Sequence, residues 1–299
     1  MNLSIVIPFY KLTFFESTLK SLSEQTDKRF KVYIGDDASP EDPSALLGKY
    51  VGKFNFTYHR FDTNLGGTSL TQQWERCIDL SENEEWIMIL GDDDVLDINF
   101  VEAFYENIAE VVSHKILVIR YATIKIDESG NFISNLYCHP KIENSVDFIF
   151  RKTRSSLSEY IFFKDKLIRV GFKNFPLGWH SDQLAILEVS DFKDIFTINH
   201  ALVFIRHSFL SISGARSNLK IKRIATVKYF YYLANSKRKK FNIEQSHLLF
   251  KNLNKTYLSD KRNVFLFIKI SNFYLSNFLV GQFYIFISSI FFKIRKSFN

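Results

Sequence analysis

The chain has 299 residues, of which 46% are hydrophobic, a composition that allows a sizeable core and argues against intrinsic disorder. Its two cysteines, Cys77 and Cys138, are too few and too widely separated for a disulfide framework or a zinc site. The net charge of +7 is unevenly distributed: residues 215–299 hold 17 basic and 2 acidic residues, a balance of +15, which leaves −8 for residues 1–214. An acidic body suits metal ions, and a basic tail suits phosphate-rich surfaces.

Strands and helices are predicted to alternate over the first 126 residues. Apolar, β-branched runs predict strands at residues 3–7, 30–35, 54–60, 84–90 and 115–126. Helical spacing of apolar residues predicts helices at residues 12–22, 43–51, 69–80 and 97–112, with Asp97 as the N-cap of the last. Such alternation predicts an α/β fold with a mostly parallel sheet and crossover helices.

After about residue 140 the pattern becomes less regular. It predicts a strand at residues 159–163, a short helix at 165–171, a turn followed by a helix at 178–190, and a strand that begins at Ala201.

Polar clusters follow three of the predicted strands. They are Phe9-Tyr10-Lys11 after the first strand, Asp36-Asp37-Ala38-Ser39 after the second, and Gly91-Asp92-Asp93-Asp94 after the fourth. In open α/β sheets, ligands bind beyond the carboxyl ends of the strands. We therefore expect the three clusters to lie together at one edge of the sheet and to form a binding site.

The three consecutive aspartates, Asp92, Asp93 and Asp94, need compensation because like charges repel each other. An EF-hand loop is excluded, since it needs glycine at its sixth position and glutamate at its twelfth, where this chain has Asp97 and Ala103. No GxxxxGK[ST] motif occurs, which excludes a P-loop. One interpretation is that the aspartates only cap and solvate a helix start. The other, which we favour, is a Mg²⁺ or Mn²⁺ site that substrate phosphates complete.

A phosphate-bearing ligand suggests a nucleoside diphosphate, and the second cluster offers groups for the rest of that molecule. Carboxylates at the end of the second strand can accept hydrogen bonds from a base N–H or from ribose hydroxyls. The other interpretation is that Ser39-Pro40 only forms a turn.

Taken together, these motifs resemble the family 2 glycosyltransferases, which have the GT-A fold. The family pattern is Pro-x-Tyr after a strand, Gln-Thr near the end of a helix, D-D-x-S after a second strand, an N-x-G turn and a DxD motif. These stand here as Pro8-Phe9-Tyr10, Gln25-Thr26, Asp36-Asp37-Ala38-Ser39, Asn64-Leu65-Gly66 and Asp92-Asp93-Asp94. The resemblance covers roughly residues 3–214, and it implies that residues 1–214 form a GT-A catalytic domain.

The resemblance also implies a role for individual residues. Asp37 would contact the base, Asp92 the ribose and Asp93 the metal, with Asp94 as a supporting group of the metal site. The family commonly has an aspartate one place earlier, where this chain has Gly91. The expected nucleotide-sugar contacts are Pro8, Tyr10, Asp36, Asp37, Asn64, Arg76, Asp92, Arg206 and Ser211.

Transfer of a sugar to a hydroxyl also needs a base that takes the hydroxyl proton. Inverting members of the family place an aspartate at a helix start after the DxD motif, which implies Asp182 in the segment "GWHSDQ". Ser181 stands where the family usually has glutamate. Other interpretations are that His180 is the base, or that Asp182 only interacts with the helix dipole. Trp179 and His180 are expected to line the acceptor pocket, although Trp179 could equally pack in the core.

The segment "IRHSFLSIS" resembles the part of the family that closes over the diphosphate. Arg206 would clamp phosphate oxygens, and Ser211 would donate a hydrogen bond to them. His207 would complete the metal shell, unless it is a structural histidine beside a strand. The resemblance thus implies that Mn²⁺ or Mg²⁺ is held by Asp93, Asp94 and His207.

The C-terminal region, residues 215–299, is expected to be helical, basic and rich in aromatic residues. Its run Ser271–Phe292 has no charged residue and is long enough to span a bilayer, but its Asn, Gln and Ser content makes it a poor span. We expect a helix lying in the membrane interface, anchored by Lys293, Arg295 and Lys296. Polybasic segments such as residues 236–240 suit anionic lipid. The other interpretation is a helical lid on the catalytic body. Nucleic acid is less favoured because no recognised binding fold accompanies the charge.

The sequence therefore predicts a metal-dependent inverting glycosyltransferase that uses a nucleotide-diphospho-sugar, a UDP-sugar, and a saccharide or lipid-linked acceptor. The resemblance and the tail imply bacterial surface polysaccharide synthesis, peripheral on the cytoplasmic face of the cell membrane. The first eleven residues lack the features of a signal peptide, which fits that location. Two other functions stay open: a nucleotidyltransferase, although its Gly-rich basic loop is missing after the first strand, and a non-catalytic sugar- or nucleotide-binding scaffold.

Overall fold

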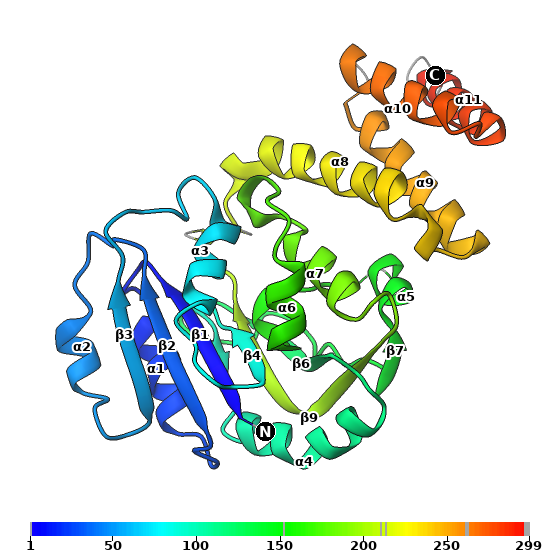
Figure 1. The fold of residues 1–299 in the computed structure, drawn as a ribbon. Helices are drawn as coiled ribbons and strands as arrows, with labels where there is room; N and C mark the ends of the chain where they lie inside the picture. Colours follow the sequence, from blue (N-terminus) through cyan, green and yellow to red (C-terminus); the bar gives the residue numbers. More distant parts are fainter. Residues whose placement is uncertain (1, 152, 210, 213, 261–262, 296–299) are drawn as a thin grey trace. The chain divides into compact units, whose positions relative to one another are not determined.

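The computed structural model describes residues 2–151, 153–209, 211–212, 214–260 and 263–295. The chain forms two compact units, residues 1–218 and residues 219–299. The first unit is an α/β fold built around one sheet, and the described part of the second unit is helical (Figure 1).

The sheet of the first unit has nine strands in the described residues, in the order β3-β2-β1-β4-β8-β6-β9-β5, with β7 paired to β9. The strands are β1 (Leu3–Phe9), β2 (Phe30–Asp36), β3 (Asn55–Arg60), β4 (Trp86–Ile89), β5 (Val95–Leu96), β6 (Val118–Ile126), β7 (Ile142–Asn144), β8 (Tyr160–Phe163) and β9 (Asp194–Arg206). Strands β3, β2, β1 and β4 pair in parallel, and β6 pairs in parallel with β9. Strands β8, β5 and β7 run antiparallel to their neighbours. The predicted α/β class is confirmed.

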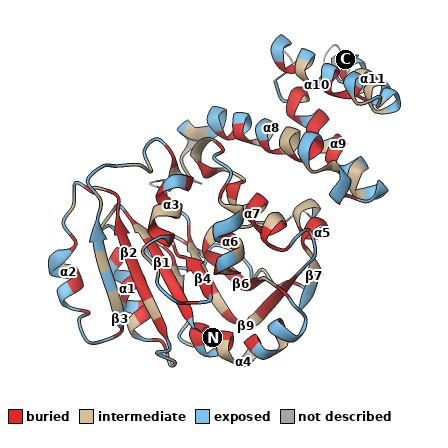
Figure 2. Cartoon of the chain, in the orientation of Figure 1, coloured by how far each residue is buried: buried red, intermediate tan, exposed pale blue. Residues whose placement is uncertain are grey.

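Helices cover both faces of the sheet (Figure 1). Side chains of α1 (Phe15–Ser23), α2 (Ser44–Gly48) and α4 (Phe100–Ser113) belong to one apolar cluster. Side chains of α3 (Leu70–Ile78), α5 (Ser145–Phe150), α6 (Lys164–Val170) and α7 (Ser181–Val189) belong to another. Strand β1 contributes to both clusters, because alternate side chains of a strand point to opposite faces. Its burial on both faces explains its continuous apolar sequence, and Figure 2 shows the central strands as buried.

Strands β5, β7 and β9 differ from the sequence prediction, because they are short or begin with polar residues. Strands β5 and β7 have two and three residues, which is too short for a recognisable alternation. Strand β9 begins at Asp194 rather than at the predicted Ala201. Its first half contains Thr197 and Asn199, which resemble loop residues, yet the Thr197 hydroxyl is buried and accepts hydrogen bonds from Arg120.

Helix α4 starts later than the sequence predicts. Its N-cap position is occupied by Asn99, so the predicted N-cap at Asp97 is wrong by two residues. The Asp97 carboxylate accepts the N–H of the adjacent Ile98 at 2.9 Å, which keeps it outside the helix.

Gln25 fixes the start of α4 against α1. Its Nε2 donates to the backbone oxygens of Ser21 at 3.0 Å and Asp97 at 2.7 Å, and its Oε1 accepts the N–H of Val101 at 3.0 Å. The side chain is buried. Because buried polar groups need partners, this one amide sets the path of the chain just after the three aspartates.

We expect Gln25→Ala to lower the free energy of unfolding by about 2 kcal/mol, because the Asp97 carbonyl and the Val101 N–H lose a buried partner. Urea denaturation measures the difference. The matched control is Gln72→Ala, which truncates an exposed glutamine of α3 and should change stability by less than about 0.5 kcal/mol. Equal stability of Gln25→Ala and the wild type would show that this amide does not hold α4.

The described part of the second unit consists of α8 (Leu219–Ser236), α9 (Ile243–Leu258), α10 (Val264–Ser276) and α11 (Val280–Arg295). The uncharged run Ser271–Phe292 is divided between α10 and α11, so the expectation that it forms one continuous helix is wrong. The chain reverses at Phe278, which has a positive φ of 55°. Among the described residues, no helix combines the length and the apolar character needed to cross a bilayer.

Candidate functional site

A cavity of about 560 Å³ lies at the edge of the sheet where β1, β2 and β4 end. Residues of all three predicted polar clusters line it, so the expected shared edge exists. The predicted site residues in its wall are Pro8, Tyr10, Asp37, Asn64, Asp92, Asp93, Asp94, Trp179, His180, Asp182, Arg206 and Ser211. The predicted residues outside this wall are Asp36, Arg76 and His207.

Asp92 ties the end of β4 to the end of β1. Its Oδ2 accepts the backbone N–H groups of Tyr10 at 2.9 Å and Lys11 at 3.0 Å. Ser39, after β2, donates its hydroxyl to the carbonyl of Tyr10 at 2.7 Å. Burial raises the pKa of Asp92, while the two N–H groups oppose that shift. The three clusters are therefore joined by hydrogen bonds and hold one another in place.

Asp94 is held by the end of β9 and by the turn before β8. Its Oδ1 accepts the backbone N–H of Arg206 at 2.8 Å, and its carboxylate also bonds the Ser158 hydroxyl. Ser158 accepts the N–H of Gly91 at 3.0 Å, which fixes the chain just before the aspartates. Asp94 is buried, so burial raises its pKa and these donors oppose the shift.

Asp93 lacks such support. The only hydrogen bond to the Asp93 carboxylate from the described residues comes from the N–H of Asp93 itself. Burial raises its pKa well above the usual range, and the charges of Asp94 and Asp92 raise it further. A cation beside this carboxylate would remove that penalty.

The donor set fits a hard divalent cation, because carboxylate oxygens are the ligands that Mg²⁺ and Mn²⁺ prefer. Among the described residues, no group of three or more His, Cys, Asp or Glu side chains could hold a metal by itself. An ion bound at Asp93 would therefore need oxygen ligands from a substrate or from water. This is the usual arrangement for Mg²⁺, which is often bound by one or two carboxylates and substrate phosphates.

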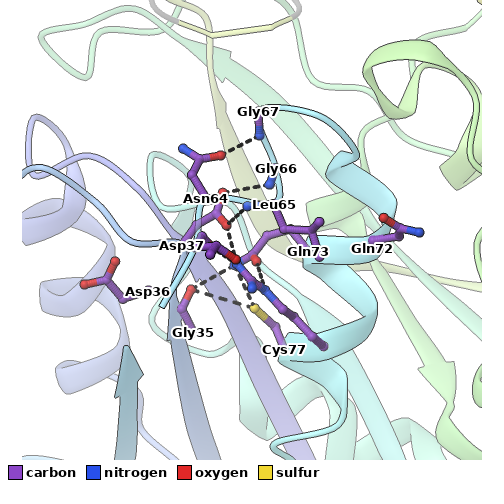
Figure 3. A network of polar contacts seen from close by, with 12 residues as sticks. Gly35, Asp36, Asp37, Asn64, Leu65, Gly66, Gly67, Gln72, Gln73 and Cys77 are labelled. Carbon is purple, nitrogen blue, oxygen red and sulfur yellow. Dashed lines mark hydrogen bonds and ion pairs between the residues drawn. The ribbon is translucent and has the colours of Figure 1, made fainter. Parts of the chain in front are cut away.

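Asp37 holds the turn between β3 and α3 (Figure 3). Its Oδ1 accepts the N–H of Leu65 at 2.7 Å, and its Oδ2 accepts the N–H of Gly66 at 2.9 Å. Asn64 closes the same turn, since its Oδ1 accepts the N–H of Gly67 at 2.7 Å. A Cβ atom on Gly66 would lie 2.6 Å from Asp37 Oδ2, so a side chain here would displace the Asp37 carboxylate. The N-x-G motif thus shapes the cavity wall around Asp37.

The side chains of Arg76 and Asp36 bond to neighbouring residues and do not line the cavity. The Nη2 of Arg76 donates to Asp37 and, at 2.8 Å, to the carbonyl of Thr63. The Oδ2 of Asp36 accepts from Tyr58 and from Arg60, and Figure 3 shows its side chain directed away from Asp37. Because neither residue lines the cavity, the predicted contacts of Asp36 and Arg76 with the nucleotide stay predictions.

Arg206 closes the cavity from β9. Its Nε donates to the carbonyl of Asp93 at 2.9 Å, and its Nη1 donates to the carbonyls of Asp127 and Glu128 at 2.8 and 3.1 Å. Its Nη2 makes no hydrogen bond in the described part of the chain. The side chain of His207 is exposed and outside the cavity wall, so its predicted role in the metal shell has no supporting position.

Asp182 lines the same cavity from the first turn of α7. Burial raises its pKa to about 6, and the nearby charge of Glu159 adds to the shift. His180, in a left-handed conformation with φ of 70°, bonds Gln183 through Nδ1 at 2.7 Å. Burial lowers the pKa of His180, which favours its neutral form. The Trp179 ring lies edge-on to the His180 ring at 5.7 Å.

Two charged residues behind Asp182 are missing from the sequence prediction. Glu159 is fully buried, and its Oε2 accepts from Nη1 of Arg154 at 2.6 Å. Arg154 also donates to the Thr123 hydroxyl at 2.6 Å, and its charge lowers the pKa of both Asp94 and Asp182. A glutamate just before a short strand gives no sequence signal of burial, and its ion pair is visible only in the fold.

Comparison with known proteins shows a family match. A family model described as glycosyl transferase family 2 matches residues 4–170. No curated protein sequence matches the chain at a significant level.

Solved structures share the fold at low sequence identity. A crystal structure of S. aureus TarS has a TM-score of 0.61 and 16% identity, and covers 86% of this chain and 44% of its own. S. aureus TarS 1-349 in complex with UDP-GlcNAc has a TM-score of 0.59 and 14% identity, with coverage of 99% and 92%. GalNAc-T7 with UDP, GalNAc and Mn²⁺ has a TM-score of 0.52 and 11% identity, with coverage of 88% and 57%. The chain thus spans less than half of the first TarS chain.

We expect the carboxyl resonance of Asp182 to titrate with a midpoint near pH 6 in an NMR titration. Glu159→Gln should move that midpoint to lower pH, because loss of the buried negative charge makes the ionised form of Asp182 less unfavourable. The control Glu106→Gln changes an exposed carboxylate on α4 and should leave the midpoint unchanged. A wild-type midpoint near pH 4 would contradict this account of the site.

Proposed function

This chain belongs to glycosyl transferase family 2, and from that membership we propose that it is an inverting transferase that uses a UDP-sugar donor and a saccharide or lipid-linked acceptor. The observation that carries the proposal is the set of strand-end clusters joined around one cavity, with Asp37 and Asp93 on one wall and Asp182 on the other. The proposed setting is surface polysaccharide synthesis at the cytoplasmic face of a bacterial membrane.

The donor assignment is supported by the chemistry of the first wall. The Asp37 carboxylate accepts from Leu65, Gly66 and Arg76, and its Oδ2 retains acceptor capacity for a base N–H. Asp92 uses its Oδ2 on backbone N–H groups, which leaves Oδ1 as a candidate acceptor for a ribose hydroxyl. The fold is shared with a TarS structure in complex with UDP-GlcNAc. These features together favour a uridine nucleotide over other ligands.

The proposed metal ligand is Asp93, with Asp94 as its support. Mn²⁺ or Mg²⁺ bound there would offset the negative charge that builds up on the leaving diphosphate. The bonds from Arg206 to Asp94 and to the Asp93 carbonyl hold this segment and keep the Asp93 carboxylate in the cavity. The fold is also shared with GalNAc-T7 in a structure with UDP and Mn²⁺.

The proposed base is Asp182. Its carboxylate takes the proton of the acceptor hydroxyl while the hydroxyl oxygen forms a bond to the anomeric carbon of the donor. The bond between that carbon and the diphosphate breaks at the same time, and attack from the face opposite the leaving group inverts the configuration. A pKa of about 6 leaves Asp182 ionised at pH 7 and still basic enough to accept a proton. Trp179 and His180 would form the acceptor side of the cavity.

The direct test of the proposed function is a screen of nucleotide-sugars for release of the nucleoside diphosphate, with and without Mn²⁺. We expect release of UDP from a UDP-sugar, including slow hydrolysis in the absence of acceptor. Metal-dependent UDP binding without turnover of any donor or acceptor pair would favour a non-catalytic scaffold. Turnover of a nucleoside triphosphate with a sugar phosphate would favour a nucleotidyltransferase.

We expect Asp93→Asn to make UDP binding independent of Mn²⁺, because the amide keeps the shape of the side chain but loses the charge that holds the cation. Isothermal titration with UDP, with and without Mn²⁺, measures the effect. The matched control is Asp97→Asn, which lies outside the cavity wall and should retain the metal dependence of the wild type. The assignment of Asp93 is wrong if its variant keeps the same dependence.

We expect Asp182→Asn to lower kcat by about 10²–10⁴, the usual cost of losing a general base, while the affinity for UDP stays unchanged. In the wild type, kcat should fall as the pH is lowered through about 6, because Asp182 becomes protonated. The control Asp165→Asn changes an exposed aspartate of α6 and should retain full activity. Near-normal turnover of Asp182→Asn would move the role of the base to another residue.

A further inference from the structure

Helices α10 and α11 of the second unit expose an unusual number of large apolar side chains. We call this set the tail's apolar face. Its members are Val264, Phe265, Ile268, Leu275, Phe278, Val280, Tyr284, Ile285, Phe291 and Phe292. Phe278, in the turn between the helices, is 90% exposed. Soluble proteins rarely expose so many large apolar side chains on two consecutive helices, and exposed apolar surface of this kind commonly marks an interaction site.

The apolar face is not the core of the second unit. The opposite sides of α10 and α11 form that core, where Phe273 and Tyr274 contact Phe250 of α9, and Phe286 contacts Tyr257. These core residues are buried, and Figure 2 shows buried and exposed stripes on both helices. On α10, Val264 and Ile268 are spaced four residues apart on the exposed side. Each helix is thus apolar on its outer side as well as its inner side.

The charge of this region identifies the kind of surface that the face fits. Residues 215–299 contain only two acidic residues, Glu244 and Asp260, against 17 basic ones. Exposed lysines occur on the neighbouring segments, among them Lys239, Lys240 and Lys251. Exposed apolar side chains in a strongly basic region match the boundary between lipid tails and anionic headgroups.

We propose that the tail's apolar face inserts into the interfacial layer of a membrane that contains anionic lipid, with the turn at Phe278 entering the lipid. Helices α10 and α11 lie in the interface and do not cross it, consistent with the absence of a spanning helix among the described residues. A second copy of the chain fits this face less well, because two tails that each carry a balance of +15 repel each other. The proposed attachment to the membrane does not depend on whether the donor is a UDP-sugar.

The test is co-sedimentation of the full chain with two kinds of vesicle, one of phosphatidylcholine alone and one of equal parts phosphatidylcholine and phosphatidylglycerol. We expect binding to the acidic vesicles that weakens between about 0.1 M and about 1 M salt but persists, since salt screens only the basic contribution. Phe278→Glu with Tyr284→Glu should lower the partition coefficient at least about tenfold at both salt concentrations. Lys239→Glu with Lys240→Glu should lower it only at low salt.

The matched control is Val51→Glu, which places the same charge at an exposed apolar residue of the first unit and should bind vesicles like the wild type. UDP titration of each variant reports separately on the nucleotide site, so loss of lipid binding is distinguishable from loss of the proposed function. The proposal is overturned if the wild type ignores acidic vesicles at low salt, or if Phe278→Glu with Tyr284→Glu binds them equally well. It is also overturned if ultracentrifugation shows dimers that this double variant abolishes while vesicle binding is absent, since the face would then join two copies.

Discussion

Three adjacent carboxylates at the end of a buried strand are the constraint on which the site depends. Side by side in a partly buried position, they can all be charged only if each one is compensated. The backbone N–H groups of Tyr10 and Lys11 compensate Asp92, and the N–H of Arg206 with the Ser158 hydroxyl compensates Asp94. Asp93 lacks equivalent donors among the described residues, and its pKa is raised well above the usual range. The cation proposed to bind at Asp93 would supply this missing compensation.

The compensating contacts also assemble the cavity. The bonds of Asp92 join the ends of β1 and β4, Ser39 adds the segment after β2, and Arg206 adds β9. Segments that lie far apart in the sequence thus meet because their polar groups satisfy one another. At Asp182, which also lines the cavity, burial raises the pKa to about 6; the charge of Glu159 adds to the shift and that of Arg154 opposes it. One part of the cavity therefore suits an anionic ligand with its cation, and another suits proton transfer.

Much of this arrangement could be predicted from the sequence, because it follows from local patterns. Continuous apolar strands such as β1 predict a covered parallel sheet, and the position of Asp92, Asp93 and Asp94 after a strand places them at its ligand-binding edge. The unpredicted features depend on contacts and turns that the local sequence pattern does not reveal. The burial of Glu159 depends on Arg154 and Thr123, and the division of the run Ser271–Phe292 depends on a reversal at Phe278 that apolar composition does not reveal.

We propose that one cavity at the strand ends binds a uridine diphosphate group through Asp37 and a cation at Asp93. A crystal structure of the chain with UDP and Mn²⁺ is the decisive measurement. We expect the uracil ring within hydrogen-bonding distance of the Asp37 carboxylate, and Mn²⁺ coordinated by Asp93 and the diphosphate. UDP bound outside this cavity, or in the cavity with its diphosphate and Mn²⁺ away from Asp93, would show that this assignment is wrong.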